Sequence, residues 1–392
     1  MRKIIILYFC ILTATVLPFS ADANPTITSS SGTLEDGGSF IIKGSGFGTH
    51  PLKIEWLGGP NGNIEQGGNG TAFSKSGWWA DPTNGTWGQA PLYSTARAHS
   101  GTKSIKQSWP VGSNYDSGFG FDTGGPIGTL YISWWIYFKH AGSQGQYKMF
   151  RIEDTNDVMD SDGTFYYNQW YDTGGGNYQA ANYLFCSLNY DQCYPGSNPA
   201  LRYPADMLRP NQWVRIEVYG KESSGSGVRD GSLSFLQHSQ SGSPIQMLSG
   251  GPWNGTIITR ASGVSARWRF IQFEGYWGNI GDGTGTGEEA YIDDIYIQVG
   301  TQARVEIGDN LSWASCTHRE IQAPVNWSDG SITFTANKGS FANGTTVYLY
   351  VVDSNGNVNA QGYQVNIGSS GGGGGGGDTI SPSPPTGVRI KN

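Results

Sequence analysis

Aromatic and polar side chains alternate along several expected strands, a pattern suited to holding a sugar chain. A sugar ring has an apolar C–H face and a rim of hydroxyl groups, so it requires flat aromatic side chains and planar hydrogen-bonding groups. The residues with this chemistry are Tyr131, Trp135, Tyr137, Arg151, Gln169, Arg215, Glu217, Gln272, Glu274 and Tyr276. The alternative is that these aromatics cover a sandwich face or contact a neighbouring domain, because apolar atoms form much of any protein surface.

Paired carboxylates, which a glycoside hydrolase uses as acid and base or nucleophile, are not found at a suitable spacing. Glu288 and Glu289 are adjacent, as are Asp293 and Asp294. Within a strand, adjacent side chains point to opposite faces, so neither pair is expected to act on one bond. This spacing disfavours glycoside hydrolysis.

Elimination on a uronate polymer requires a base such as His or Tyr and a cation or amide that neutralises the uronate carboxylate. The main candidates are Lys148, Arg151, His140 and Tyr276, and the further ones are Arg269, Gln169, His238 and Tyr167. His99 precedes Ser100 and Gly101, and we interpret it as a turn residue because glycine-rich turns rarely hold a base rigidly.

Two acidic segments have the oxygen ligands that Ca²⁺ prefers. One is a loop of acidic and amide residues before Gly163, with Asp154, Asn156, Asp157, Asp160 and Asp162. The other is the Asp293-Asp294 pair, in which Asp294 is the candidate ligand of a structural Ca²⁺. The loop departs from the EF-hand spacing, so a merely solvated loop is the alternative there.

The cysteines predict one small disulfide loop and no zinc site. Cys186 and Cys193 are close enough in sequence to pair, and export permits a disulfide, although two free thiols are the alternative. Cys316 is left unpaired, and His318 is the only residue at ligand spacing from it, so zinc is not expected.

The composition favours an all-β protein. Charged residues make up only 14% of the chain, whereas 60 residues are Gly and 14 are Trp, so long amphipathic helices are hard to build. Turn dipeptides such as Asn84-Gly85, Asp162-Gly163 and Asp230-Gly231 recur along the chain, which is typical of sandwiches and barrels. The net charge of −7 without a basic run makes nucleic acid and anionic membranes poor partners.

The two ends predict an exported protein with a flexible tail. Residues 1–23 have a basic start, an apolar stretch and an Ala-Asp-Ala end, the order of a signal peptide, and the apolar stretch is too short to span a membrane. Residues 369–392 contain a glycine run and then a proline-rich segment, which predicts a linker or tail. The proline-rich segment resembles the start of a fibronectin type III-like module. We therefore expect a secreted or cell-surface location.

Residues 60–300 contain strands that alternate well. In 130–139, Ile132, Trp134, Ile136 and Phe138 share one face and are the expected core; in 213–219, the expected core residues are Val214, Ile216 and Val218. Along the chain the order is a Ser-Ile-Lys strand after Lys103, the Trp-rich strand at 130–139, the Trp-x-Arg-Ile-Glu strand at 213–217 and a closing Ile-Asp-Asp-Ile-Tyr-Ile strand at 292–297. This order resembles the concanavalin A-like jelly rolls of polysaccharide-binding modules and polysaccharide lyases. The blocks of the best known alginate lyase family are not present.

The flanking segments, residues 24–59 and 301–368, share a second resemblance. A Pro-x-Ile start at Pro25 and a Gly-x-Gly-Phe-Gly segment ending at Gly48 are similar to the opening of IPT/TIG immunoglobulin-like domains. The usual continuation, a Val-x-Ile-Gly pattern and a Trp-Ser-Asp turn, appears only at Val305 and Trp327. The resemblance implies one Ig-like domain that is split by the jelly roll, and two small β-units flanking it are the alternative.

Together these patterns predict a secreted carbohydrate-binding protein that recognises an extended polysaccharide in a jelly-roll groove. Cell-surface or matrix components are further candidate partners. Two alternatives stay open: a polysaccharide lyase acting by β-elimination on a uronate polymer, and a surface structural or adhesion protein without catalysis.

Overall fold

A computed structural model describes residues 24–50, 52–80, 89–111, 116–141, 145–154, 165–171, 182–186, 210–239, 245–246, 258–260, 262–279 and 287–372. Nearly all regular structure in these ranges is antiparallel β-sheet, which confirms the predicted all-β class. The exceptions are a one-turn helix, α1 (Asn63–Gln66), and a 3₁₀ turn, η1 (Trp313–Ser315). No helix within these ranges is long and apolar enough to cross a membrane.

Two sheets form a large sandwich, and the first of them is called the inner sheet. Its strands, in spatial order, are β14 (Ile245–Gln246), β13 (Ser232–Ser239), β12 (Trp213–Lys221), β8 (Thr129–Lys139), β17 (Glu288–Val299), β6 (Ser104–Trp109) and β5 (Leu92–Ser94), with β3 (Ile54–Trp56) also paired to β17. The long central strands β8, β12 and β17 carry the alternating residues noted in the sequence.

The second sheet of the sandwich is called the outer sheet. Its strands are β11 (Asn182–Cys186), β10 (Phe165–Tyr171), β9 (Gly145–Asp154), β15 (Trp268–Phe273), β7 (Phe119–Asp122) and β4 (Trp78–Ala80), with β16 (Tyr276–Asn279) also paired to β9. Strands β9, β15 and β16 bring together residues that are more than 100 positions apart in the sequence.

The remaining strands form a third sheet, called the small β-unit. Its strands are β22 (Tyr363–Asn366), β21 (Thr346–Val352), β18 (Arg304–Gly308), β19 (Arg319–Ser328), β20 (Ser331–Thr335), β2 (Ser39–Ser45), β1 (Thr26–Thr33) and β23 (Ser370–Gly372). Strand β2 pairs with β20 in register, so segments from before and after the large sandwich share one sheet and one hydrophobic core. The assignment of this unit to the IPT/TIG-like family stays a prediction.

The core of the sandwich follows the alternation in the sequence. Ile132, Trp134, Ile136 and Phe138 are fully buried, as are Val214, Ile216 and Val218, so both predicted core sets are confirmed. The outer sheet contributes Tyr147, Met149, Ile152, Ile271 and Phe273 from the other side. Burying an aliphatic or aromatic side chain of this size stabilises the fold by about 1.5–3 kcal/mol, so this shared layer fixes how the two sheets face one another.

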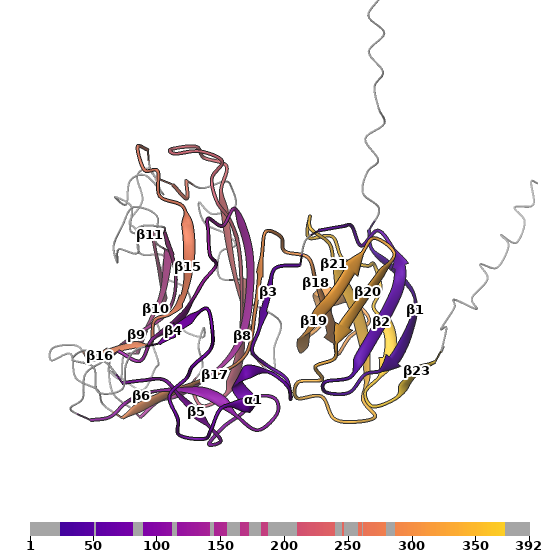
Figure 1. The fold of residues 1–392 in the computed structure, drawn as a ribbon, viewed down its shortest axis with the longest axis horizontal. Coiled ribbons are helices and arrows are strands. Elements are labelled where there is room, and N and C mark those ends of the chain that lie inside the picture. Colours follow the sequence, from indigo (N-terminus) through magenta and orange to yellow (C-terminus); the bar gives the residue numbers. More distant parts are fainter. Residues whose placement is uncertain are drawn as a thin grey trace, which may run out of the picture.

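The three sheets follow one another as layers, with the outer sheet on one side, the inner sheet in the middle and the small β-unit on the other side (Figure 1). The inner sheet therefore has one face in the sandwich core and one face toward the small β-unit. The outer sheet has one face in the sandwich core and one face directed away from the small β-unit, called here the outer face.

Candidate functional site

The inner-sheet face opposite the core is covered by the small β-unit. Tyr131, Trp135, Arg215 and Glu217 were predicted to line a ligand groove, yet none is more than 3% exposed. They lie beneath β18 and β19; for example, the indole Nε1 of Trp135 donates to Glu320 Oε2 at 3.1 Å. The alternation correctly placed them on one face, but that face contacts a neighbouring domain, so their assignment to an open groove was wrong.

Charged residues from both sides of this junction form a buried network, called the junction network. It consists of Arg215, Glu217 and His238 from the inner sheet and Arg304, Glu306 and Arg319 from the small β-unit. Arg215 Nη2 lies 2.7 Å from Glu306 Oε1, and Arg319 Nη2 lies 2.9 Å from Glu217 Oε2. Each side thus supplies a cation to the other side's carboxylate, which fixes the registry of the two units because misalignment would leave buried charges unpaired.

A small cavity remains beside the junction network. Its volume is about 130 Å³, and Tyr131, Glu217, Arg304 and Trp313 are among its lining residues. Pockets that bind drug-sized ligands span roughly 300–1,000 Å³, so this cavity is too small for an extended polysaccharide. The junction is therefore a structural interface.

The junction network predicts that the protein loses stability as the pH falls. Burial lowers the pKa of His238 to about 4, although Glu217 opposes this shift. Burial alone would raise the pKa of Glu306, but Arg304, Arg319 and Arg215 hold it at about 2. Both pKa values are lower in the folded state, so the unfolded chain binds more protons in acid and the free energy of unfolding decreases.

We expect His238 to lower the free energy of unfolding as the pH falls from 6.5 through about 4. Glu306 should lower it further as the pH falls from 4.5 through about 2. Urea denaturation at a series of pH values measures both windows. The His238→Gln variant should show a shallower decrease in the upper window. A wild-type stability that stays constant from pH 6.5 to 4 would contradict the prediction.

Asp293 and Asp294 do not point to opposite faces, contrary to expectation. Asp293 Oδ2 accepts the backbone N–H of His99 at 2.8 Å, and Asp294 Oδ2 lies 2.8 Å from the same residue's Nδ1. The cause is a bulge in β17, where the register shifts after Asp293 and Asp294 adopts a φ of 48°. Both carboxylates are buried, and burial followed by the charge of Asp294 raises the pKa of Asp293.

This arrangement bears on the predicted calcium site at Asp294. Its other oxygen, Oδ1, accepts the hydroxyl of Ser100 at 2.7 Å, so among the described residues both oxygens already have hydrogen-bonding partners. Calcium binding there stays a prediction. His99 does lie in a bend, as expected, but it is buried at the junction, and its ring is stacked on Trp135 with centroids 3.8 Å apart.

Two further candidates are also partly or fully buried. Tyr137 is half-buried on the junction side of the inner sheet, with the Arg97 guanidinium 4.0 Å from its ring centroid. The side chain of His140 is 2% exposed, stacks on Phe138 and lies 3.6 Å from Glu288. Burial lowers the pKa of His140. It stacks on the core residue Phe138 and lies near Trp277, which separates it from the other catalytic candidates.

The outer face carries a row of residues that runs across four strands, called the cross-strand row. Trp79 on β4 is in register with Gly120 on β7, Gly120 with Gln272 on β15, and Gln272 with Arg151 on β9. Residues that are paired across strands share a face, and the flanking Ile271 and Phe273 point into the core, so the row lies on the outer side of the sheet. Trp79 is exposed there and Gln272 is half-buried, whereas Arg151 is only 1% exposed. Three strand spacings make the row about 14 Å long.

Trp79 begins the row and is positioned by a glycine. A Cβ atom at Gly120 would lie 2.6 Å from both Cε2 and Cζ2 of the Trp79 indole. The ring therefore lies over the backbone of Gly120, which only a residue without a side chain allows. Because Trp79 is 36% exposed, its other ring face remains available to a ligand.

Charged residues continue the outer face beyond Gln272. Arg151 is bound to Glu274 through two hydrogen bonds of 2.5 Å. Lys148 lies 3.9 Å from the same carboxylate, and its Nζ is 4.6 Å from the centroid of the Tyr276 ring. The Lys148 side chain is 26% exposed, and Gln272 and Tyr276 are half-buried. Five predicted ligand or catalytic residues therefore gather here: Lys148, Arg151, Gln272, Glu274 and Tyr276. Arg151 and Glu274, however, are only 1% and 5% exposed and bind each other, so their assignment to an open groove was wrong, as it was for Arg215 and Glu217.

Sequence reasoning missed Trp79. Its signal was the Trp78-Trp79 dipeptide, since adjacent aromatics in a strand must point to opposite faces. Trp78 packs in the core against Phe119 and Phe121, which leaves Trp79 outside. The sequence offered no strong strand pattern around this three-residue strand.

Several predictions lie outside the described residues. They include the leader at residues 1–23, the acidic loop after Asp154, the partner cysteine Cys193 and the tail after residue 372. Strand β10 is described, but the side chain of Gln169 is not, and the same holds for Cys186 in β11. Cys316 is a free, buried thiol.

Comparisons with known proteins give no family for this chain. No protein-family model and no curated protein matches the sequence. Among solved structures, the alginate lyase vAL-1 from Chlorella virus is 13% identical, with a TM-score of 0.36 over 53% of this chain and 89% of its own. Peanut lectin is 10% identical, with a TM-score of 0.30 over 59% of this chain and 96% of its own. Identities and TM-scores this low do not support an inference about activity.

Proposed function

We propose that this protein binds an extended polysaccharide across the outer face of its large sandwich. The observation that carries the proposal is the cross-strand row, in which an exposed indole ring over Gly120 is followed by Gln272 and Arg151. Trp79 offers a flat apolar platform for a sugar ring, and the half-buried amide of Gln272 offers a planar hydrogen-bonding group, whereas the buried Arg151 supports the row from beneath. The leader expected at residues 1–23 would deliver the protein to where such polymers occur.

Lys148 favours a polymer that carries carboxylates. Its ammonium group is partly exposed beside the row and lies 3.9 Å from Glu274, a carboxylate that binds Arg151 more closely, while Arg151 is shared with Glu153 at 3.7 Å. A uronate carboxylate that approached Lys148 would gain a charge-assisted hydrogen bond, which is stronger than a neutral one. The proposed ligand is therefore a uronate-containing polysaccharide.

Affinity gel electrophoresis tests this proposal with alginate, glucuronan, pectate and a neutral glucan as the embedded polymers. We expect at least one uronate polymer to retard the protein, and added salt to weaken the retardation because charge contributes. Equal mobility in every gel would contradict the proposed function.

A second candidate function, β-elimination, is favoured by one specific observation. Tyr276 is in register with Lys148, and the ammonium lies 4.6 Å from the phenol ring. A phenol and an ammonium side by side provide a proton-transfer group and a group that neutralises the uronate carboxylate. Absorbance of the unsaturated product on alginate, glucuronan and pectate measures this reaction. Binding without such product on any of the three would leave binding as the function and contradict elimination.

A further inference from the structure

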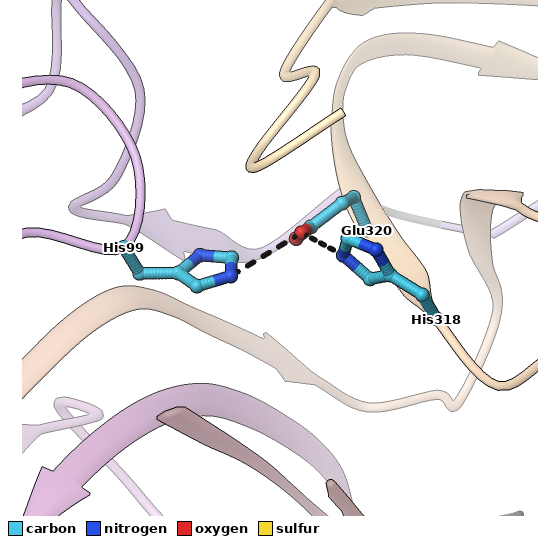
Figure 2. A group of neighbouring side chains, drawn as sticks. All are labelled: His99, His318 and Glu320. Atoms are coloured by element: carbon cyan, nitrogen blue, oxygen red, sulfur yellow. Dashed lines mark hydrogen bonds and ion pairs between the residues drawn. The ribbon is translucent and has the colours of Figure 1, made fainter. Parts of the chain in front are cut away.

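Two imidazoles and one carboxylate meet at the junction between the large sandwich and the small β-unit. His99 comes from the segment before β6, whereas His318 and Glu320 come from the start of β19 (Figure 2). One nitrogen of each histidine and one carboxylate oxygen of Glu320 all lie within 4.8 Å of one another. Glu320 Oε1 is 2.6 Å from His318 and 3.5 Å from His99. Sequence spacing could not show this group, because some 220 residues separate His99 from the others.

The His99 ring is oriented as a metal-binding histidine would be. Its Nδ1 lies 2.8 Å from Asp294 Oδ2, so a proton on Nδ1 is held by that carboxylate and the lone pair is on Nε2. The His99 side chain is completely buried, and Nε2 makes no hydrogen bond with the residues that the structure describes. A carboxylate behind a histidine fixes the tautomer and orients the free nitrogen toward a metal ion.

Neighbouring side chains also hold the other two candidate ligands in position. Glu320 Oε2 is held by the Trp135 indole, which directs Oε1 to the two imidazoles. His318 is stacked on Phe341 with centroids 4.2 Å apart, and its side chain is 16% exposed, so it lies at the rim with access to solvent. Ser340 Oγ is 3.4 Å from His318 Nε2 and could complete the coordination, as could a water molecule.

The local charge also favours a cation. Asp36, Asp294 and Glu320 are close enough to act on one another electrostatically, and Asp293 is buried beside Asp294. Lys338 opposes the charge of Asp36 and Arg215 that of Glu320, whereas the two imidazoles are neutral when they bind a metal. A divalent ion would add positive charge beside the buried carboxylates of Asp293, Asp294 and Glu320.

We propose that His99, His318 and Glu320 form a binding site for a divalent transition metal such as Zn²⁺, which bridges the large sandwich and the small β-unit. Two imidazoles and one carboxylate, with a fourth position open to water or Ser340, form a donor set that zinc accepts. Tetrahedral coordination at about 2.0–2.1 Å places ligand atoms about 3.4 Å apart. The 3.5 Å between His99 and Glu320 already fits, and His318 must withdraw slightly from Glu320.

Metal analysis of the full chain, purified without a polyhistidine tag, tests this site. After incubation with Zn²⁺ and gel filtration, the wild type should retain about one zinc per chain and His318→Gln much less. His50→Gln is the matched control, because His50 lies in the same β-unit outside the cluster, and it should retain zinc like the wild type. Zinc should also raise the melting temperature of the wild type but not of His318→Gln.

Cobalt gives a second measurement that needs no variant. Co²⁺ bound by this donor set should produce the intense visible absorption of a tetrahedral site, and added Zn²⁺ should abolish it. Wild-type protein that retains no more zinc than His318→Gln would overturn the proposal, and so would the absence of any cobalt spectrum. Neither result would bear on polysaccharide binding at the outer face.

Discussion

Replacing Arg215 with Met should lower the free energy of unfolding by about 3–5 kcal/mol, since it removes one partner of a buried ion pair. Arg215 is 1% exposed and donates to Glu306 at 2.7 Å, to Ser133 at 2.8 Å and to the backbone carbonyl of Arg319 at 2.8 Å. Methionine fills a similar volume but has no positive charge, so the Glu306 and Glu217 carboxylates keep fewer cationic partners in a buried interface. Urea denaturation monitored by tryptophan fluorescence measures the effect.

The matched control is Arg269→Met. Arg269 makes a two-pronged ion pair with Asp122 at 2.8 and 2.7 Å, so it is also an arginine bound closely to a carboxylate, but both side chains are 35% exposed. Exposed ion pairs contribute at most about 1 kcal/mol, because water screens them. If Arg215→Met lowers the free energy of unfolding no more than Arg269→Met does, the junction network does not hold the two units together.

Replacing Trp79 with Ala should weaken polysaccharide binding about ten- to hundredfold, which corresponds to about 1.4–2.8 kcal/mol. The alanine removes the only part of the cross-strand row that offers a flat apolar surface. Little stability should be lost, because Trp79 is 36% exposed and Trp78 fills the core side of the same strand. Isothermal titration with an oligosaccharide of the polymer bound best in gels measures the affinity.

Two controls separate a ring effect from a general loss of apolar surface. Trp79→Phe keeps a smaller ring over Gly120 and should retain part of the affinity. Leu311→Ala alters an apolar residue that is 45% exposed in the small β-unit, and it should bind like the wild type. If Trp79→Ala also binds like the wild type, the row is not the binding surface.

The alternation of β8 and β12 predicted which residues share a face but not what lies on that face. Ile132 and Val214 were placed correctly in the core because a period of two depends only on the strand itself. Tyr131 and Arg215 were assigned to a ligand because their partners, Arg304 and Glu306, are distant in the sequence. A polar face that binds sugar and a polar face that docks a charged domain have the same local pattern.

On the outer face, the residues selected from the sequence do lie near one another. Lys148, Arg151, Gln272, Glu274 and Tyr276 were selected for their chemistry alone, and the pairing of β9 with β15 and β16 brings them together. Lys148, Gln272 and Tyr276 are partly exposed there, whereas Arg151 and Glu274 are buried. Trp79 was missed since its strand is too short to give a pattern, and its position depends on Gly120 in another strand. The meeting of His99 with Glu320 was likewise invisible, because it depends on how two units dock.

A crystal structure of the protein with an oligosaccharide of its preferred polymer would show whether the outer face binds sugar. We expect one sugar ring stacked on the indole of Trp79 and the following rings crossing Gln272 toward Lys148. A sugar chain bound instead to the small β-unit, with the indole of Trp79 free of contact, would contradict this expectation.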